Sequence, residues 1–366
     1  MTHALQWEQV ERAFKKLQRL EKKEQLLPLS SLFLVASHVL RIQNNEYSDQ
    51  REQEKLYEES LKQAEKGIEQ LRAYSETADS ATLAMKHFIE GGINGFTATL
   101  KIETSPFEAL NEGLSALKLL EQAIEVDTTL YDAYLGCGIF HCSLAKSPAI
   151  VKGALKVLGR SASVDSGLAY LRLSAHNGRY TSSVAKIYLI HFLSPYYGHL
   201  RQEKTSLMHA LQSQYSRNPY FFFLEFEELL CFYPPDFYAL DTRRKLKNAL
   251  HRCEDANQIS CSRYCELLKW QYWLLNPFPP AMLRPDAKYD LQAFNYYPLF
   301  VRTVSDKHFL TSCADNNNKP EDFQQRRTSI EAHSEMLQKM VEESTINTNR
   351  QGFYRWHVRD ALRFED

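Results

Sequence analysis

The sequence predicts an all-α protein built from stacked antiparallel helix pairs, and three observations lead to this fold class. Apolar residues recur at steps of three and four along most of the chain, which places them on one side of a helix. No segment of the sequence shows the sustained alternation of apolar and polar residues that a half-buried strand requires. Glycine and proline each occur only 13 times in 366 residues, which is too few for a turn-rich β-sandwich.

The composition is that of a soluble globular protein. Lysine and arginine number 44 and aspartate and glutamate 45, so the net charge of −1 gives the chain no overall attraction to nucleic acid. The seven cysteines are too sparse for a disulfide-stapled secreted scaffold. The longest uncharged apolar stretch, residues 25–40, is shorter than the about 20 residues that span a bilayer. We therefore expect a cytoplasmic protein without a transmembrane segment, or an exported or periplasmic one if the true start lies upstream of Met1.

Three helices are predicted in the first hundred residues. The first carries an apolar face made of Trp7, Val10, Phe14 and Leu17. The second repeats this spacing with Tyr57, Leu61, Ala64, Ile68 and Leu71. The third has a stripe of mostly small residues, namely Ala84, Phe88, Gly91, Gly95 and Ala98. Because glycine costs about 1 kcal/mol in a helix, this stripe indicates that a neighbouring helix packs closely against it.

Capping residues predict where later helices begin and end. Ser105 is followed by proline and, three residues on, by Glu108, which predicts a helix start with a capping box. Asn218, also followed by proline, predicts a second start of the same kind. Gly178 predicts a helix end with glycine in the left-handed conformation.

Prolines become more frequent after Tyr233, and we place a soft domain boundary near Pro234. Residues 1–50 are expected to form an N-terminal helical capping segment, and residues 51–233 a series of helical repeats with an insert at 143–163. Residues 234–366 are expected to form a C-terminal helical region that packs on the repeats or extends them.

An internal repeat is centred on Ala116, Leu120 and Ala123, which have small, large and small side chains in that order. Weaker copies of this helix begin at Gly167, 51 residues later, and at Lys204, a further 37 residues on. The usual period of a two-helix repeat is about 34 residues, so the first interval contains an insert of about 17 residues.

The segment after the first copy contains an aromatic residue, Tyr134, and a glycine, Gly138, and this order resembles the start of a tetratricopeptide repeat. Thr128 and Cys137 depart from that repeat, which usually has proline and leucine there. The irregular spacing, together with the segments 132–138, 165–168 and 177–180, resembles the tetratricopeptide repeat protein 39 / inclusion-body-clearance family and its bacterial relatives. The resemblance covers roughly residues 57–233. It implies a TPR-like α-solenoid with an irregular insertion, acting as a non-catalytic protein-binding scaffold.

In this repeat frame, one helix presents four residues to the concave side of the solenoid: Asp132, Leu135, Ile139 and Cys142. The surface is mostly apolar, which favours a peptide or a helix of a partner protein over an acidic tail. The partner's identity and the oligomeric state do not follow from the sequence.

The insert supplies a second candidate surface. Lys152, Lys156 and Arg160 recur at four-residue spacing, opposite apolar residues, as in a short basic amphipathic helix. Such a helix would contact anionic lipid or a partner's carboxylates. The alternative, which we favour, is a packed helix with a solvated lysine edge.

Two other classes of function remain open. A small-ligand or glycan-binding helical module would need a closed pocket near Trp270 and Trp273. An enzyme or zinc protein would have its best candidate ligands in His251, Cys253, Cys261 and Cys265. The closely spaced cysteine pair of a zinc knuckle is missing, so buried thiols are the favoured interpretation. We predict no cofactor, no metal and no catalytic residue.

Two further clusters are expected to belong to the core. Cys137 and His141 lie four residues apart and could form a thiol–imidazole pair, but core packing is the favoured interpretation. The aromatic residues between Tyr220 and Phe226 are likewise expected to be used mainly in the core.

Overall fold

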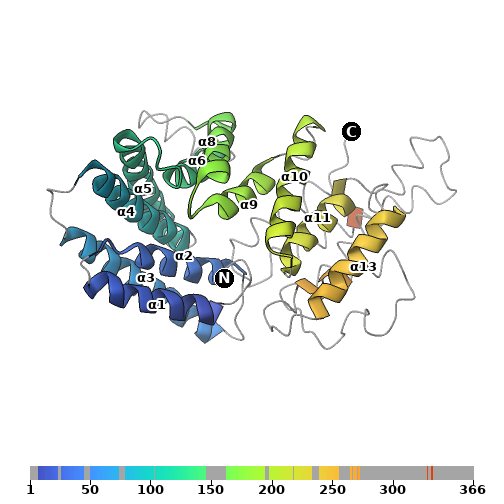
Figure 1. Cartoon of the computed structure of the whole chain (residues 1–366), viewed down its shortest axis with the longest axis horizontal. Coiled ribbons are helices and arrows are strands. Elements are labelled where there is room, and N and C mark those ends of the chain that lie inside the picture. The colour runs from blue at the N-terminus through green and yellow to red at the C-terminus, as the bar shows by residue number, and fades with distance from the viewer. Residues whose placement is uncertain are drawn as a thin grey trace. The chain divides into compact units, whose positions relative to one another are not determined.

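The computed structural model describes residues 7–272, apart from 24–25, 45–49, 74–78, 103, 146–161, 194–197, 217, 233–238, 255–263, 266 and 270, together with residues 328, 331 and 332. Within these residues the regular elements are helices and no strand occurs, which confirms the all-α prediction (Figure 1). No helix in the described part of the chain is both long and apolar enough to cross a membrane. The chain divides into two compact units, residues 1–211 and 212–366. This division falls before the boundary expected near Pro234.

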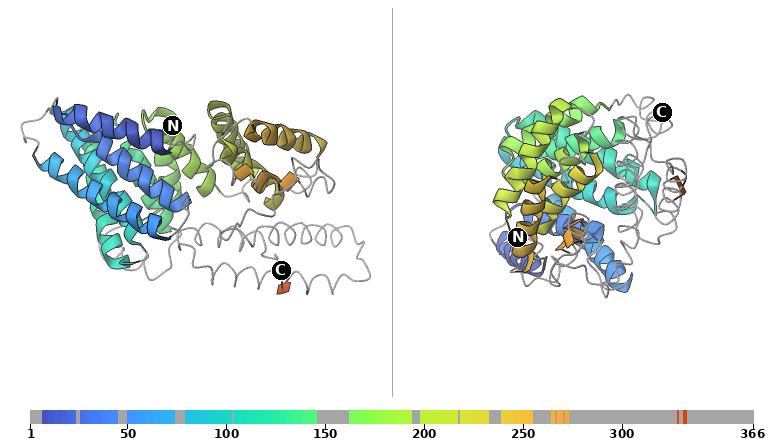
Figure 2. Two further views of the ribbon diagram at one scale, coloured as in Figure 1. Left: turned by 90° about the horizontal axis from the view of Figure 1, so that it is seen from below. Right: turned by 90° about the vertical axis from the view of Figure 1, so that its right-hand side faces the viewer.

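Unit 1 contains nine described helices, of which the last continues into unit 2. They are α1 (Trp7–Lys23), α2 (Leu29–Asn44), α3 (Gln50–Arg72), α4 (Ser80–Lys101), α5 (Pro106–Val126), α6 (Ala133–Ala145), α8 (Val164–Asn177), α9 (Ser182–Phe192) and α10 (Gly198–Gln214). From α1 to α9, each helix packs against the next along the chain (Figures 1 and 2). A second set of contacts joins α2 to α4, α4 to α6 and α6 to α9.

The core of unit 1 lies between these helices and is made of aliphatic and small residues. Its fully buried members include Val35, Leu71, Ile89, Leu117 and Ala133, which come from α2, α3, α4, α5 and α6 respectively. Each helix therefore buries one apolar face against its neighbours, as the three-and-four periodicity predicts. Burial of this apolar area supplies most of the free energy that holds the helices together.

Small residues join the helices within three pairs, α2 with α3, α4 with α5, and α6 with α8. The contacts are Ser31 with Gly67, Gly91 with Ala116, and Gly138 with Gly167. A Cβ atom added at Gly67 would lie 2.9 Å from the Cβ of Ser31, and one at Gly91 would lie 3.1 Å from the carbonyl oxygen of Ala116. Both distances are too short for an ordinary carbon contact, so these helices approach to the limit that glycine allows. The close packing predicted from the stripe around Gly91 is confirmed.

Of the two predicted helix starts, Asn218 has its predicted cap and Ser105 differs, and Asp79 is a cap that the sequence analysis did not predict. Asp79 caps α4, since its Oδ1 accepts a hydrogen bond of 2.8 Å from the backbone N–H of Thr82. At the start of α11 (Pro219–Phe232), Asn218 Oδ1 accepts one of 3.0 Å from the N–H of Tyr220. Helix α5 begins at Pro106 as predicted, but the side chain of Ser105 makes no capping hydrogen bond. The capping box predicted there is wrong, and only the proline marks the start.

The end of α8 also differs from the prediction. Helix α8 ends at Asn177 as expected, but Gly178 has φ −62° and ψ 132°, which is an extended and not a left-handed conformation. Glycine is required at position 178 because there is no room for a side chain: an added Cβ would lie 2.6 Å from the carbonyl oxygen of Ser174. The predicted helix end was therefore correct, but the left-handed conformation predicted for Gly178 was wrong.

In unit 2 the described helices are the end of α10, α11 and α13 (Leu240–Glu254), with short helical stretches between residues 264 and 272. Helix α11 packs on α13. Its aromatic residues Phe221, Phe223 and Phe226 are almost completely buried, and the ring centroid of Phe223 lies 5.7 Å from that of Tyr264. The prediction that these aromatics belong to the core is confirmed for the three phenylalanines.

Candidate functional site

Helix α6 carries the four residues predicted to line a concave surface, and three of them are buried. Asp132, which directly precedes the helix, Leu135 and Cys142 have almost no exposed area, whereas Ile139 is half-buried. The Cys142 thiol lies 3.8 Å from the carbonyl oxygen of Val164 and packs against Gly167 of α8. Of the four, Ile139 therefore offers side-chain surface to a partner.

Asp132 has a structural task, because it binds the turn between α8 and α9. Its Oδ1 accepts hydrogen bonds from the backbone N–H groups of Tyr180 (2.7 Å) and Thr181 (2.8 Å), and its Oδ2 accepts one from Arg179 (3.2 Å). The Thr181 hydroxyl also donates to Oδ1, at 2.8 Å. Since that hydroxyl hydrogen is used, Ser174 Oγ donates to Thr181 Oγ1, also at 2.8 Å. This network ties the start of α6 to α8 and α9.

Of the thiol–imidazole pair on α6, Cys137 lies in the packed interior and His141 is half-buried. Cys137 is buried, and this burial raises the pKa of its thiol to about 12. A thiol in that environment stays protonated at neutral pH and is a poor nucleophile. The ring of His141 lies 5.7 Å from that of Tyr170, so the imidazole packs among aromatic side chains. Packing, as predicted, accounts for both residues.

The remaining candidates from the sequence lie largely outside the described residues. These are the basic insert surface (Lys152, Lys156 and Arg160), the tryptophans Trp270 and Trp273, Cys261, and the side chain of Cys253. Of the proposed zinc ligands, His251 is exposed on α13 and Cys265 is buried. Among the residues that the structure describes, no group of three or more histidine, cysteine, aspartate or glutamate side chains is arranged to hold a metal ion.

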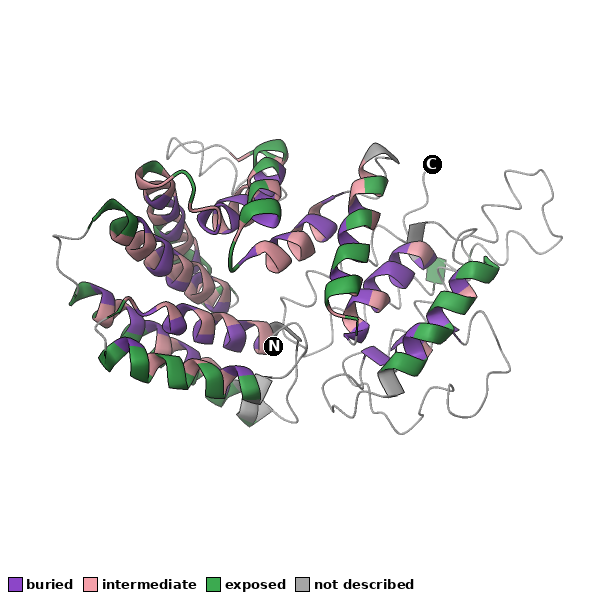
Figure 3. Ribbon diagram, viewed as in Figure 1, coloured by how far each residue is buried: buried purple, intermediate pink, exposed green. Residues whose placement is uncertain are grey.

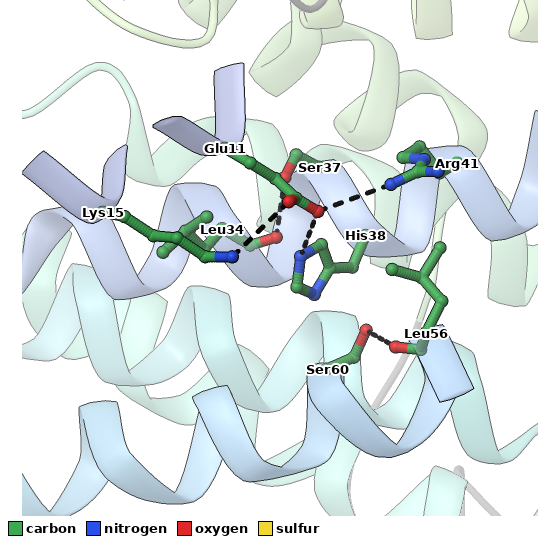
Figure 4. A network of polar contacts seen from close by, with 8 residues as sticks. All are labelled: Glu11, Lys15, Leu34, Ser37, His38, Arg41, Leu56 and Ser60. Carbon is green, nitrogen blue, oxygen red and sulfur yellow. Dashed lines mark hydrogen bonds and ion pairs between the residues drawn. The ribbon is translucent and has the colours of Figure 1, made fainter. Parts of the chain in front are cut away.

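A polar cluster joins α1 to α2 (Figure 4). Glu11 of α1 lies 3.2 Å from Nε2 of His38, 3.4 Å from Nη1 of Arg41 and 3.5 Å from Nζ of Lys15. The hydrogen bond with His38, helped by the positive charges around it, lowers the pKa of Glu11 to about 2, against a partial desolvation that acts the other way. Further along α1, the buried carboxylate of Glu21 accepts hydrogen bonds from the backbone N–H (2.9 Å) and the hydroxyl of Ser30. Both acidic side chains are therefore used to dock α1 onto α2.

The opposite side of α1 is basic, and the sequence analysis did not single it out. Arg12, Lys16, Arg19 and Lys23 are exposed and recur at steps of four, three and four. We call these four residues the basic row. The spacing alone places them on one side of a helix, so the signal was present in the sequence. The apolar face predicted from Trp7, Val10, Phe14 and Leu17 already implied that the basic row lies on the side away from the core.

Helix α11 contains a second feature that the sequence did not indicate. Glu227 is buried, and within the described part of the chain neither of its carboxylate oxygens has a hydrogen-bond partner. Burial, together with repulsion from Glu228, raises the pKa of Glu227 to about 8. A carboxyl group of this kind is protonated and neutral at pH 7.

We compared the chain with protein-family models, with curated proteins and with solved structures, and none of the three comparisons gave a match. The case for a function therefore rests on the helices of this chain and on the side chains that they expose.

Proposed function

We propose that unit 1 is a TPR-like solenoid of helix pairs that acts as a non-catalytic scaffold and holds a peptide or a partner protein. The pairs would be α2 with α3, α4 with α5, and α6 with α8, and α9 follows the third pair. The order of packing supports this assignment, since the first helix of each pair contacts the first helix of the next: α2 with α4, α4 with α6, and α6 with α9. Stacked repeats have this pattern of nearest-neighbour contacts, to which unit 1 adds a contact between elements further apart, Phe33 of α2 with Tyr180 before α9.

The observation that carries the proposal is the recurrence of one small-residue contact in three successive pairs. Gly138 meets Gly167 in the pair that contains the insert, at the position where the resemblance to a tetratricopeptide repeat places its close-packing glycine. Gly91 with Ala116 and Ser31 with Gly67 are the same kind of contact in the two preceding pairs. The family resemblance implies repeats that are unevenly spaced along the chain. A closest contact that recurs in each pair, while the connecting segments differ in length, fits such repeats.

The burial on α6 restricts where a partner would bind. Asp132, Leu135 and Cys142 are enclosed, so a partner that contacts α6 would touch Ile139 and the neighbouring half-buried side chains of Phe140 and His141. An apolar residue beside aromatic rings is typical of the anchor points at which binding energy concentrates. We therefore place the partner-binding surface of the scaffold around Ile139.

Site-specific photo-crosslinking tests this proposal. A photoreactive phenylalanine analogue in place of Ile139 should capture a defined partner in cells of the native host, and purified partner should then bind saturably. Ile139→Glu should abolish that binding. The matched control is Phe107→Glu, because Phe107 of α5 is 84% exposed and the substitution introduces the same charge on α5 instead of α6.

Leu135→Glu is not a suitable test, because Leu135 is buried and the carboxylate would disturb the fold. Circular dichroism should show that Ile139→Glu and Phe107→Glu keep the helical content of the unaltered chain. Unchanged partner binding by a folded Ile139→Glu variant would remove the surface around Ile139 from consideration.

A further inference from the structure

The two sides of α1 have different chemistry. The side that packs on α2 carries Val10, Phe14 and Gln18, with the carboxylates of Glu11 and Glu21. Val10 is buried, the ring of Phe14 stacks on Phe33 with centroids 5.5 Å apart, and Gln18 donates a hydrogen bond of 3.2 Å to Ser31 Oγ. This side of the helix is therefore fully used by contacts within unit 1.

The basic row lies on the other side of the helix. At 3.6 residues per turn, its four members fall within about 60° of one another around the helix axis, opposite Val10 and Phe14. Lys15 and Lys22, which flank the row, are exposed as well. Helix α1 carries six lysine and arginine side chains and three glutamates, a net charge of +3, and among its described side chains the exposed charged ones are all cationic. The net charge of the whole chain is only −1, so positive charge is concentrated locally on this face.

Leucines border the basic row on one side. Leu17 and Leu20 of α1 are 37% and 47% exposed, and Leu26, in the turn that follows the helix, is 56% exposed. Figure 3 shows exposed residues along the outer side of α1, whereas most residues of α2 are buried or half-buried. Large exposed apolar side chains next to lysine and arginine are typical of helices that lie flat in the interface of a membrane.

We propose that this face of α1 binds an anionic phospholipid surface. The basic row would face the phosphate and carboxylate groups of the lipids, and Leu17, Leu20 and Leu26 would enter the boundary between headgroups and acyl chains. A nucleic acid would use the cations but would gain nothing from the leucines, which is why lipid is the favoured occupant.

Co-sedimentation of the full chain with lipid vesicles tests the proposal. The protein should bind vesicles of phosphatidylcholine that contain phosphatidylserine, and should bind pure phosphatidylcholine vesicles much more weakly. Binding should weaken between about 0.1 M and 1 M salt, since the Debye length falls from about 10 Å to about 3 Å.

Charge-reversal variants test whether the basic row is the surface that binds lipid. Lys16→Glu together with Arg19→Glu should lower the partition coefficient at least about 25-fold, because each basic residue near an anionic membrane contributes about five-fold. The matched control is Lys62→Glu with Lys66→Glu, two exposed lysines on α3, which makes the same charge change on another helix and should leave binding unchanged.

The leucines distinguish lipid from other anions. Leu17→Gln with Leu20→Gln should lower vesicle binding about ten-fold while leaving every charge in place. Leu83→Gln with Leu173→Gln is the control, because these leucines are 37% and 38% exposed on α4 and α8. Circular dichroism and thermal melting should confirm that all four variants are folded.

Three results would overturn the proposal. The first is equal binding to vesicles with and without phosphatidylserine. The second is undiminished binding after the Lys16 and Arg19 reversals. The third is a leucine variant that binds vesicles as well as the unaltered chain does, combined with competition by RNA or an acidic peptide for the same face. That result would assign the basic row to a polyanion instead of lipid. None of these outcomes depends on the partner surface proposed around Ile139.

Discussion

Gly138 of α6 and Gly167 of α8 face each other with no room for a side chain on either. A Cβ atom added to one would lie 3.0 Å from the carbonyl oxygen of the other, in both directions. The contact brings the two backbones together although residues 146–163 separate the helices in the sequence. The contact between these glycines therefore holds α6 against α8 independently of the segment that connects the two helices.

Gly167→Ala should destabilise unit 1 by about 1–3 kcal/mol, because the new methyl group would overlap the backbone of both Gly138 and Cys142. Gly95→Ala is the control: its nearest neighbour would be the Cβ of Ala116, at an ordinary 3.8 Å. That substitution should stabilise α4 by up to about 1 kcal/mol through helix propensity. Urea denaturation followed by circular dichroism measures both, and equal effects of the two alanines would contradict the close approach at Gly167.

Asp132→Asn should destabilise unit 1 by about 1–3 kcal/mol. The amide offers one acceptor oxygen where the carboxylate serves Arg179, Tyr180 and Thr181, and its NH₂ group would face backbone N–H groups. Asp127→Asn is the matched control, since Asp127 is half-buried and its carboxylate accepts hydrogen bonds from Thr129, two residues further along the chain. Chemical denaturation compares the two, and the hydrogen-exchange protection of the first turn of α9 should fall only in Asp132→Asn.

Glu11 should make the docking of α1 sensitive to acid. Its pKa is lowered from 4.5 to about 2 in the folded protein, mainly by the hydrogen bond with His38. Its contribution to the free energy of unfolding is therefore complete above pH 4.5 and is lost as the pH falls toward 2. Hydrogen-exchange protection of α1 in Glu11→Gln should already be low at pH 6 and should change less between pH 5 and about 2.5 than in the unaltered chain. An identical acid profile in the two proteins would show that Glu11 does not hold the helix.

Glu227 should have the opposite dependence on pH. Its pKa is raised from 4.5 to about 8 in the folded state, so its carboxyl group favours folding most below pH 4.5. That contribution is lost progressively as the pH rises toward 8, because the unfolded chain ionises first. Glu227→Gln should remove this decline and make α11 more stable at pH 8 than it is in the unaltered chain. Asp241→Asn, at an exposed carboxylate of α13 whose pKa is lowered, should leave the decline unchanged. Hydrogen exchange of the α11 amides, corrected for intrinsic rates, measures the effect.

Cys137 should resist alkylation in the native protein. Its thiol is buried and has a pKa of about 12, so neither access nor thiolate is available at pH 8. Peptide mass spectrometry after iodoacetamide treatment should find Cys137 unmodified in the native chain and fully modified in urea. Rapid native labelling would show that the interior of α6 opens, and would reopen the thiol–imidazole interpretation.

Spacing along the sequence predicted the helices well, because a helix buries one face and leaves a period in the chain. The stripe around Gly91 and the prolines that open α5 and α11 are examples. The capping of Ser105 and the backbone of Gly178 were not predictable in the same way, since each depends on neighbours that approach from elsewhere in the fold. Local residue preferences do not contain that information.

The candidate site was predicted less well for the same physical reason. The three- and four-residue spacing places Leu135, Ile139 and Cys142 on one side of α6. The resemblance to a repeat does not reveal which side of that helix another helix covers. The close approach of α8 at Gly167 encloses Cys142, and the turn at Gly178 captures Asp132. The basic row was equally visible in the sequence, opposite the apolar face predicted for this helix, and the structure adds that Glu11 and Glu21 face α2.

The rings of Phe33 in α2 and Tyr180 in the turn before α9 lie 5.6 Å apart, although 146 residues separate them in the chain. A linear stack of repeats melts from its ends, since each terminal unit has a single neighbour to leave. Here an early helix also touches a late turn, so α2 cannot separate from the turn before α9 without losing this contact. Unit 1 should therefore unfold in one cooperative transition instead of unzipping pair by pair.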